Sequence, residues 1–292
     1  MCLALITLVS VSCSVKPPRG SIVDDLGREV NISSVPQRIV SLAPSNTEIL
    51  FALGLADKIV AVTDMCDYPP EARAKPKLGG FEPNLEQIVA FGPDLVLAIG
   101  EYPDLVSQLE SKGLIVIALQ PKDLQGILTD IELVGQITGT ETRASELVGD
   151  VRQRIDSVVE RVKGTPRHRV FFELDASADS STPWTAGPGS FAHALIELAG
   201  GENVARDALT PWVQFSVEEI IRSDPEVIIL ADARYGVTPD IVTKRPGWGV
   251  ITAVKKGAIY PIDPDLATRP WPRIVEGLEE MAHIIHPELF PH

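Results

Sequence analysis

Short apolar runs alternate with polar, turn-rich segments along the whole chain. In the first half, buried strands are predicted at residues 38–42, 59–62, 95–99 and 114–118; in the second half, at 169–174, 227–231 and 258–262. A helical or turn-rich segment separates each strand from the next, which is the pattern of parallel α/β packing. Ligands of such sheets lie at the carboxyl ends of the strands, where the loops gather.

The two halves of the chain begin in the same way. Strand 38–42 is followed by a polar turn and an apolar helix that stops at Gly54. Strand 169–174 is followed by a loop, a helix over 191–198 and a stop at Gly200. The same order of strand, loop and helix predicts two similar α/β lobes with mostly parallel sheets.

A second internal repeat relates residues 84–98 to residues 216–230. Each copy starts with an N-cap residue, Asn84 or Ser216, continues through one apolar helical turn, breaks at a proline nine positions on, and enters a β-branched strand. Equal spacing of all these features indicates a duplicated αβ unit, with one copy in each lobe.

The repeat also leaves one free acid in each lobe. Gln87 and Glu219 stand three positions after the N-cap, where they would close a capping box, so Glu86 and Glu218 remain unengaged in the first helical turn. Acids at such positions favour the helix dipole. Their matched placement also fits docking, since one exposed acid per lobe would meet two basic sites on a partner with approximate twofold symmetry.

Between the halves, residues 141–163 form one amphipathic helical pattern that glycines bound on both sides. At about 1.5 Å per residue such a helix extends over roughly 30 Å, enough to join two lobes, and its stiffness predicts a small closure. We therefore expect a ligand cleft between the lobes and the following order: a signal or lipoprotein segment at 1–13, a polar lead-in at 14–37, an N-terminal lobe at 38–138, a linker helix at 139–166 and a C-terminal lobe at 167–292.

Composition narrows the class of protein. A chain of 292 residues with 45% hydrophobic residues is long enough for two cores. The formal net charge of −14 argues against nucleic acid and against anionic lipid surfaces as partners.

The first residues are typical of export. Residues 3–11 are apolar but too short to span a bilayer, and a small residue precedes Cys13, as at a bacterial lipoprotein processing site. We expect an extracytoplasmic protein with a lipid on Cys13; a plain signal peptide and an unprocessed apolar terminus are the alternatives. No Lys or Arg precedes the apolar run, and Ser10 stands where Leu is usual. Because Cys2 also lies in this segment, Cys66 is predicted to be unpaired.

Catalytic and bare-metal motifs are not found in the sequence. Ser190 has no nucleophile-elbow context, and neither a Walker loop nor a dinucleotide fingerprint follows a predicted strand. The five histidines show no metal-site spacing, although His283 and His286 share a predicted helix face. A binding protein without a resident metal or cofactor is therefore favoured over an enzyme.

Aromatic and charged residues near the predicted strand ends are candidates for ligand contacts. Trp184 and Trp212 fall in Pro- and Gly-rich loops of the second half, and Phe81 falls in the equivalent loop of the first. Such rings suit the flat face of a macrocycle, but they also serve as local core. Asp265 and Arg269 follow the last strand, either as a local ion pair or as polar ligand contacts.

Several segments in order along the chain resemble one family. They are PQRIVSLAPSNTE (36–48), DYPP (67–70), NLE (84–86), PWTAG (183–187), LAGGENV (198–204) and PW (211–212). Together they resemble the helical-backbone class of periplasmic binding proteins, specifically its cobalamin-binding members, from about residue 20 to the C-terminus.

The resemblance implies roles for individual residues. It implies that Glu86 and Glu218 form salt bridges with arginines of an importer's membrane permease. It also implies that Trp184 and Trp212 contact the ligand and that Asp265 and Arg269 hydrogen-bond the polar rim of a corrinoid. Phe81, from its place in the equivalent loop, and Met65 are further candidate ligand contacts. Met65 stands where cobalamin binders often carry an aromatic, a departure from the family pattern.

The function implied is that of a monomeric ABC importer subunit that captures cobalamin or a related corrinoid. A ferric siderophore or haem is the alternative cargo. A siderophore would call for cleft arginines, for which Arg269, Arg234 and Arg273 are the candidates. Haem would call for an iron ligand, for which Tyr68, Tyr102, Tyr235 and Met65 are the candidates. A surface sensor that hands its ligand to a receptor would share the same cleft.

Overall fold

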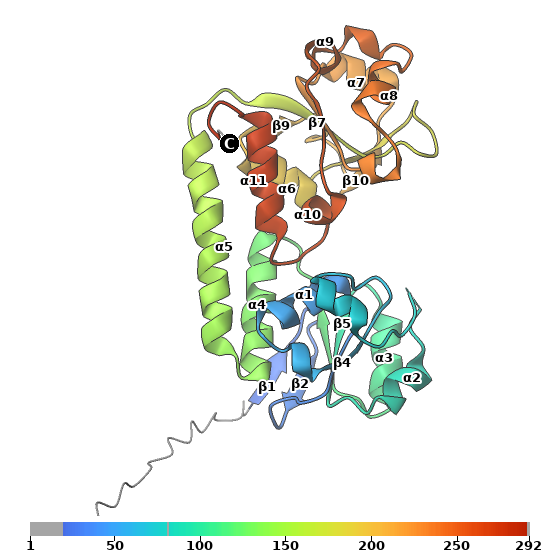
Figure 1. Ribbon diagram of the computed structural model, residues 1–292, viewed down its shortest axis with the longest axis vertical. Coiled ribbons are helices and arrows are strands. Elements are labelled where there is room, and N and C mark those ends of the chain that lie inside the picture. Colours follow the sequence, from blue (N-terminus) through green and yellow to red (C-terminus); the bar gives the residue numbers. More distant parts are fainter. Residues whose placement is uncertain (1–19, 81, 291–292) are drawn as a thin grey trace, which may run out of the picture.

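The computed structural model describes residues 20–80 and 82–290. Two α/β lobes lie one above the other, and helix α5 (Glu141–Val162) runs along both of them (Figure 1). The predicted fold, two lobes with mostly parallel sheets and one long helix between them, is confirmed. Phe81 and Cys13 lie outside the described residues.

The N-terminal lobe is built on a parallel sheet with strand order β4-β3-β5-β6. Its strands are β3 (Ile39–Ser41), β4 (Ile59–Val62), β5 (Leu95–Ile99) and β6 (Val116–Leu119), and its helices are α1 (Pro44–Ala52), η1 (Ala56–Lys58), η2 (Pro70–Ala74), α2 (Leu85–Ala90), α3 (Pro103–Ser111) and α4 (Leu124–Thr138). The last strand begins two residues later than the sequence predicted. Residues of the sheet are almost fully buried, because helices cover both of its faces.

The segment expected as a polar lead-in contains a hairpin that the sequence analysis missed. Strands β1 (Gly20–Val23) and β2 (Glu29–Ile32) pair antiparallel. The hairpin buries Ile22 and Val30 in the core of the lobe, and buried Asp24 accepts a hydrogen bond from the Ala118 amide at 3.0 Å. Each strand is only four residues long, too short for its alternation to stand out among charged neighbours.

The C-terminal lobe has a mixed sheet with strand order β10-β8-β7-β11-β12, and β9 also pairs with β7. Its strands are β7 (His168–Asp175), β8 (Trp184–Ala186), β9 (Gly201–Asn203), β10 (Trp212–Gln214), β11 (Val227–Leu230) and β12 (Ile259–Pro261), and its helices are α6 (Phe191–Leu198), α7 (Val217–Ser223), η3 (Ala233–Tyr235), α8 (Pro239–Thr243), η4 (Trp248–Val250), α9 (Thr252–Lys256), α10 (Pro264–Thr268) and α11 (Ile274–Ile285). Strands β8 and β10 are antiparallel to their neighbours. Both tryptophans had been expected in loops. Trp184 and Trp212 instead begin the short strands β8 and β10.

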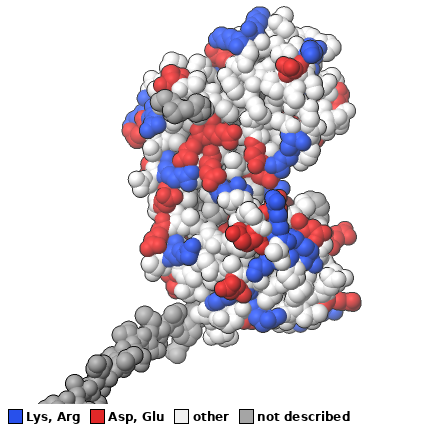
Figure 2. Space-filling model, viewed as in Figure 1, with Lys and Arg blue, Asp and Glu red and all other residues white. Residues whose placement is uncertain are grey.

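Helix α5 joins the lobes through apolar contacts with both. Val148 and Val158, on its buried face, belong to one continuous core that also contains Ile49 of the N-terminal lobe and Met281 of the C-terminal lobe. The helix packs against α4 below and α11 above, where Arg154 donates two hydrogen bonds to Glu279 at 2.9 and 2.6 Å. Figure 2 shows Asp and Glu side chains gathered over this middle region of the molecule.

The duplicated unit occupies equivalent places in the two lobes. Helix α2 leads into β5, which lies between β3 and β6; helix α7 leads into β11, which lies between β7 and β12. Ser216 and Glu219 form a complete capping box. The predicted box at α2 is only half formed, because Asn84 accepts from the Gln87 amide at 3.0 Å but the Gln87 side chain makes no return bond among the described residues.

Candidate functional site

A cavity of about 520 Å³ lies between the lobes, at the carboxyl ends of the N-terminal strands. We call it the interlobe cleft. Its wall from the N-terminal lobe consists of Ser45, Ile99, Glu101, Leu119, Gln120, Pro121 and Lys122, and its wall from the C-terminal lobe consists of Gly189, Ser190, Phe191, Pro211, Trp212, Thr268 and Pro270. The volume is in the range of small-molecule sites, and both lobes contribute to it.

Local packing explains why the N-terminal strand ends meet at the cleft. The Gly100 amide, directly after β5, donates to the Leu119 carbonyl at 3.1 Å. A Cβ atom on Gly100 would lie 2.7 Å from the Cβ of Gln120, so a side chain there would push the two strand ends apart. Glycine at position 100 thus keeps the ends of β5 and β6 together, and Glu101 and Gln120, which follow these strand ends, both line the cleft.

The opposite wall carries the aromatic residue that the sequence singled out. Trp212 is 38% exposed and lines the cleft. Beside it, the Ser190 side chain caps α6 by accepting from the His193 amide and donates to the Gly187 carbonyl at 2.7 Å. Trp184 is equally exposed and lies diagonally opposite Trp212 on the same face of the β8–β10 pair, but it does not line the cleft.

Asp265 and Arg269 form the local ion pair that was one of the two expectations, with Arg269 Nε 3.0 Å from Asp265 Oδ1. Asp265 also pairs with Arg234 at 3.2 Å. Thr268 and Pro270, on either side of Arg269, line the cleft. One buried terminal nitrogen of Arg269 has no hydrogen-bond partner among the described residues. The pair thus lies behind the cleft wall, and its contact with a ligand stays a prediction.

Two charged side chains of the cleft wall are unengaged. Glu101 and Lys122 are both exposed, and neither forms an ion pair or a hydrogen bond within 20–80 and 82–290. The wall from the C-terminal lobe contains no charged residue in the part that the structure describes. Any charge on a ligand in the cleft would therefore meet these two groups first.

Met65 lines a smaller cavity of about 140 Å³ in the N-terminal lobe. That cavity shares Ile99 and Glu101 with the interlobe cleft and also borders Tyr102, whose side chain is 39% exposed. The structure thus brings Met65 next to the cleft rather than into it.

The two acids expected to dock a partner are exposed in the first turns of α2 and α7. Neither Glu86 nor Glu218 forms an ion pair or hydrogen bond with the described part of the chain. In Figure 1 the two helices lie one in each lobe, on the side of the molecule away from α5. This geometry leaves both carboxylates available to a partner that spans the lobes.

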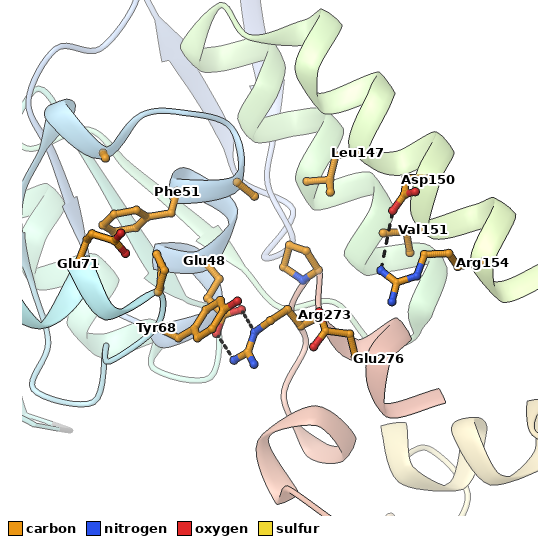
Figure 3. Close-up of a pocket in the computed structure, with 14 residues that line it drawn as sticks. Glu48, Phe51, Tyr68, Glu71, Leu147, Asp150, Val151, Arg154, Arg273 and Glu276 are labelled. Carbon is orange, nitrogen blue, oxygen red and sulfur yellow. Dashed lines mark hydrogen bonds and ion pairs between the residues drawn. The ribbon is translucent and has the colours of Figure 1, made fainter. Parts of the chain in front are cut away.

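A second cavity, of about 530 Å³, lies on the side of the connecting helix, and we call it the hinge-side cavity (Figure 3). It is lined by Glu48, Phe51, Ala52, Ala56, Tyr68, Pro69, Glu71, Leu147, Asp150, Val151, Arg154, Pro272, Arg273 and Glu276. Within it Arg273 donates to both carboxylate oxygens of Glu48 at 2.9 Å and lies 3.5 Å from the centre of the Tyr68 ring. Arg273 and Tyr68 are therefore engaged away from the interlobe cleft.

Burial controls the ionisation of Glu48. Its side chain is only 3% exposed, and loss of hydration raises its pKa to about 7, although the hydrogen bonds and charge of Arg273 act in the opposite direction. The ion pair that joins the lobes is thus sensitive to pH near neutrality.

Sequence reasoning missed several of these groups. Glu101 could have been found from the sequence, because it follows the carboxyl end of the correctly predicted strand β5, where ligands of parallel sheets lie. The pairing of Glu48 with Arg273, 225 positions apart, leaves no such signal. Cys66 is free, as predicted; it is also buried, with its sulfur 3.1 Å from the Thr47 hydroxyl.

Two negative findings concern the described residues. No group of three or more His, Cys, Asp or Glu side chains is placed to hold a metal ion there. No helix in this part of the chain combines the length and the apolar character needed to cross a membrane.

Comparison with known proteins agrees with this architecture. The family model for periplasmic binding proteins matches residues 39–266. The chain is 36% identical over 91% of its length to the uncharacterized ABC transporter substrate-binding lipoprotein YvrC of Bacillus subtilis (strain 168), of which 85% is covered. It is 30% identical over 86% of its length to the vitamin B12-binding protein of Vibrio vulnificus (strain CMCP6), of which 91% is covered.

Among solved structures, the periplasmic vitamin B12 binding protein BtuF of Vibrio cholerae superposes with a TM-score of 0.73 at 26% identity, covering 88% of this chain and 99% of that one. The periplasmic heme-binding protein RhuT from Roseiflexus sp. RS-1 gives a TM-score of 0.77 at 25% identity, covering 87% and 99%. The same fold thus serves proteins named for different ligands. From the family match and these relatives, the chain belongs to the periplasmic binding protein family and is a substrate-binding protein of an ABC transporter.

Proposed function

We propose that this protein captures a corrinoid, with cobalamin as the leading candidate, and delivers it to the membrane permease of its importer. The observation that carries the proposal is the lining of the interlobe cleft. Apolar, amide and hydroxyl groups dominate it, Phe191 and Trp212 supply aromatic faces, and the charges of Glu101 and Lys122 are balanced. Such a wall suits a large macrocycle whose periphery carries uncharged amides.

The arginines considered for an anionic siderophore are all engaged. Arg234 pairs with Asp263 and Asp265, Arg269 pairs with Asp265, and Arg273 pairs with Glu48. Because each positive charge is already matched by a carboxylate, a ligand with several negative charges would find little compensation. This balance favours a corrinoid over a ferric siderophore.

Haem is the second candidate cargo. The RhuT likeness supports it, and so does the position of Tyr102 and Met65 in the small cavity beside the cleft, since a phenolate or a thioether can serve as an iron ligand. Tyr68 is excluded from this role in the cleft because its ring packs against Arg273 on the hinge side.

Delivery rests on Glu86 and Glu218. One exposed, unpaired carboxylate in each lobe fits a permease with two basic sites, and we assign both acids to that contact. A monomer held at the outer face of the membrane by a lipid on Cys13 completes the proposal; the lipoprotein name of the Bacillus relative supports the anchor.

Titration of the purified protein with cobalamin, cobinamide, haem and a ferric siderophore tests the cargo. Quenching of tryptophan fluorescence reports occupancy, and calorimetry gives affinity and stoichiometry. Because Trp248 and Trp271 are buried, a Trp212→Phe variant shows whether the quenching arises at the cleft. Submicromolar binding of a corrinoid alone supports the proposal; binding of haem or the siderophore without a corrinoid overturns it.

A further inference from the structure

We infer that Glu101 and Lys122 select the ligand by charge, and that the cleft is built for a ligand with one positive and one negative group held apart. The inference rests on the proposed function and deepens it. Applied to corrinoids, it names complete cobalamin as the preferred cargo over cobinamide. In cobalamin the cobalt(III) corrin is positively charged and the nucleotide loop carries a phosphodiester; cobinamide lacks that loop and its negative charge.

Glu101 borders three cavities. It lines the interlobe cleft, the small cavity that contains Met65, and a groove of about 570 Å³ between α2 and α3. The close approach at Gly100 fixes its backbone beside Gln120, and its carboxylate has no partner in the described parts of the chain. No Lys or Arg borders the small cavity or the groove among those residues, whereas Glu82 and Asp104 border the groove beside Glu101.

Lys122 is free for a different local reason. It follows β6 and Pro121, and the acid next to it, Asp123, is the N-cap of α4. The Asp123 side chain accepts from the Gly126 amide at 2.8 Å, so that carboxylate is engaged with the start of its own helix. Lys122 therefore lines the cleft without an ion-pair partner among the residues that the structure describes.

The two charges lie on one wall but form no ion pair with each other. The facing wall of Phe191, Pro211 and Trp212 adds apolar contact and no described charge. A macrocycle without charged groups would leave both charges poorly solvated when it filled the cleft, and the two propionates of haem would meet Glu101 unfavourably. A ligand with a separated positive and negative group satisfies both.

Calorimetric titration of the full protein and its variants tests this assignment. Lys122→Gln is expected to weaken cyanocobalamin binding by about threefold to tenfold without weakening the binding of aquocyanocobinamide, which keeps the positive corrin and lacks the phosphodiester. Glu101→Gln is expected to weaken cobalamin by a similar factor and to strengthen haem, and added salt should shrink both effects. Matched controls are Lys112→Gln, at the end of α3, and Asp104→Asn, which lines the groove but not the cleft.

Failure of this inference is distinguishable from failure of the proposed function. If the unmodified protein binds no corrinoid, the proposed function falls. If it binds cobalamin, but Lys122→Gln changes cobalamin and cobinamide affinity equally or not at all, the charge-selection role is overturned and the corrinoid assignment remains. Circular dichroism of each variant separates loss of contact from loss of fold.

Discussion

Arg273, at the start of α11, donates two hydrogen bonds to the buried carboxylate of Glu48 in α1, so an ion pair joins the C-terminal lobe to the N-terminal lobe. The Tyr68 ring and the buried Trp271 flank the guanidinium group. Because the pair lies on the same side as α5, it holds the lobes near the axis about which they would turn.

The stability of the protein should depend on pH through Glu48. Its pKa is about 7 in the folded protein and near the ordinary 4.5 in the unfolded chain. Between these values the folded state binds a proton that the unfolded chain has released, so the free energy of unfolding falls as pH rises through this window. Glu48→Gln should remove that part of the slope in urea denaturation at pH 5, 6, 7 and 8. Glu71→Gln, an exposed residue of the same cavity, is the control; parallel curves for the protein and Glu48→Gln would contradict the assignment.

Removing the partner should cost more than removing the acid. Arg273→Met leaves a buried carboxylate without its cation, and we expect a loss of about 3 to 5 kcal/mol at pH 8. The loss should shrink at pH 5, where Glu48 takes up a proton. Arg154→Met, which breaks a more exposed pair with Glu279, should cost about 1 kcal/mol or less at either pH. Equal losses at pH 5 and pH 8 for Arg273→Met would argue against a titrating Glu48.

The aromatic wall gives an affinity prediction. Trp212→Ala should weaken ligand binding by about 1 to 4 kcal/mol, because the ring lines the cleft. Trp184→Ala should have a smaller effect, since Trp184 lies on the same strand face but outside the lining. Calorimetry with the ligand identified for the parent protein measures both. An unchanged affinity in Trp212→Ala would assign that ring to local packing.

Docking gives a prediction in cells. Reversing both Glu86 and Glu218 to Lys should abolish ligand uptake, because the two basic sites that we propose on the permease would then be repelled. Ligand affinity of the purified variant should be unchanged, since both residues lie outside the cleft. Glu146→Lys combined with Asp156→Lys on α5 makes the same charge change elsewhere and should preserve uptake. Normal uptake in the Glu86 and Glu218 variant would rule out the docking role.

Two glycines give a matched pair for stability. A Cβ on Gly277 of α11 would overlap the Leu266 carbonyl of α10, so Gly277→Ala should destabilise the protein by about 1 to 3 kcal/mol. Gly149, inside α5, has open space at the same position. Gly149→Ala should stabilise the protein by about 0.5 to 1 kcal/mol. Urea midpoints measure both, and a stable Gly277→Ala variant would show that α10 moves easily.

Long apolar patterns predicted the fold well. The boundaries of α5 and α6 and the buried strands β4 and β5 follow from helical spacing, glycine stops and β-branched runs. The hairpin of β1 and β2 and the strands that carry Trp184 and Trp212 were missed. These strands lack the continuous apolar run that marks β4, which also has only four residues, and their pairing depends on tertiary contacts that local sequence does not encode.

The candidate site was predictable only in part. Trp212 was found as an aromatic residue near a strand end, and Glu101 was within reach of the same rule. The Glu48–Arg273 pair was not, because its partners lie in different lobes, 225 positions apart, and Arg273 had been considered only as a candidate ligand contact. The ion pair of Asp265 with Arg269 was one of the expectations from the sequence. The ion pair of Asp265 with Arg234 was not predictable, because it depends on how α10 approaches η3.

The continuous core along α5 has a mechanical consequence. Because α5 packs into both lobes, we expect a ligand to enter with little rearrangement. Little of the binding free energy would then be spent on moving the lobes. The same stiffness opposes their separation when the cargo has to leave. We therefore expect the transporter to drive ligand release, by separating the parts of the two lobes that lie farthest from α5.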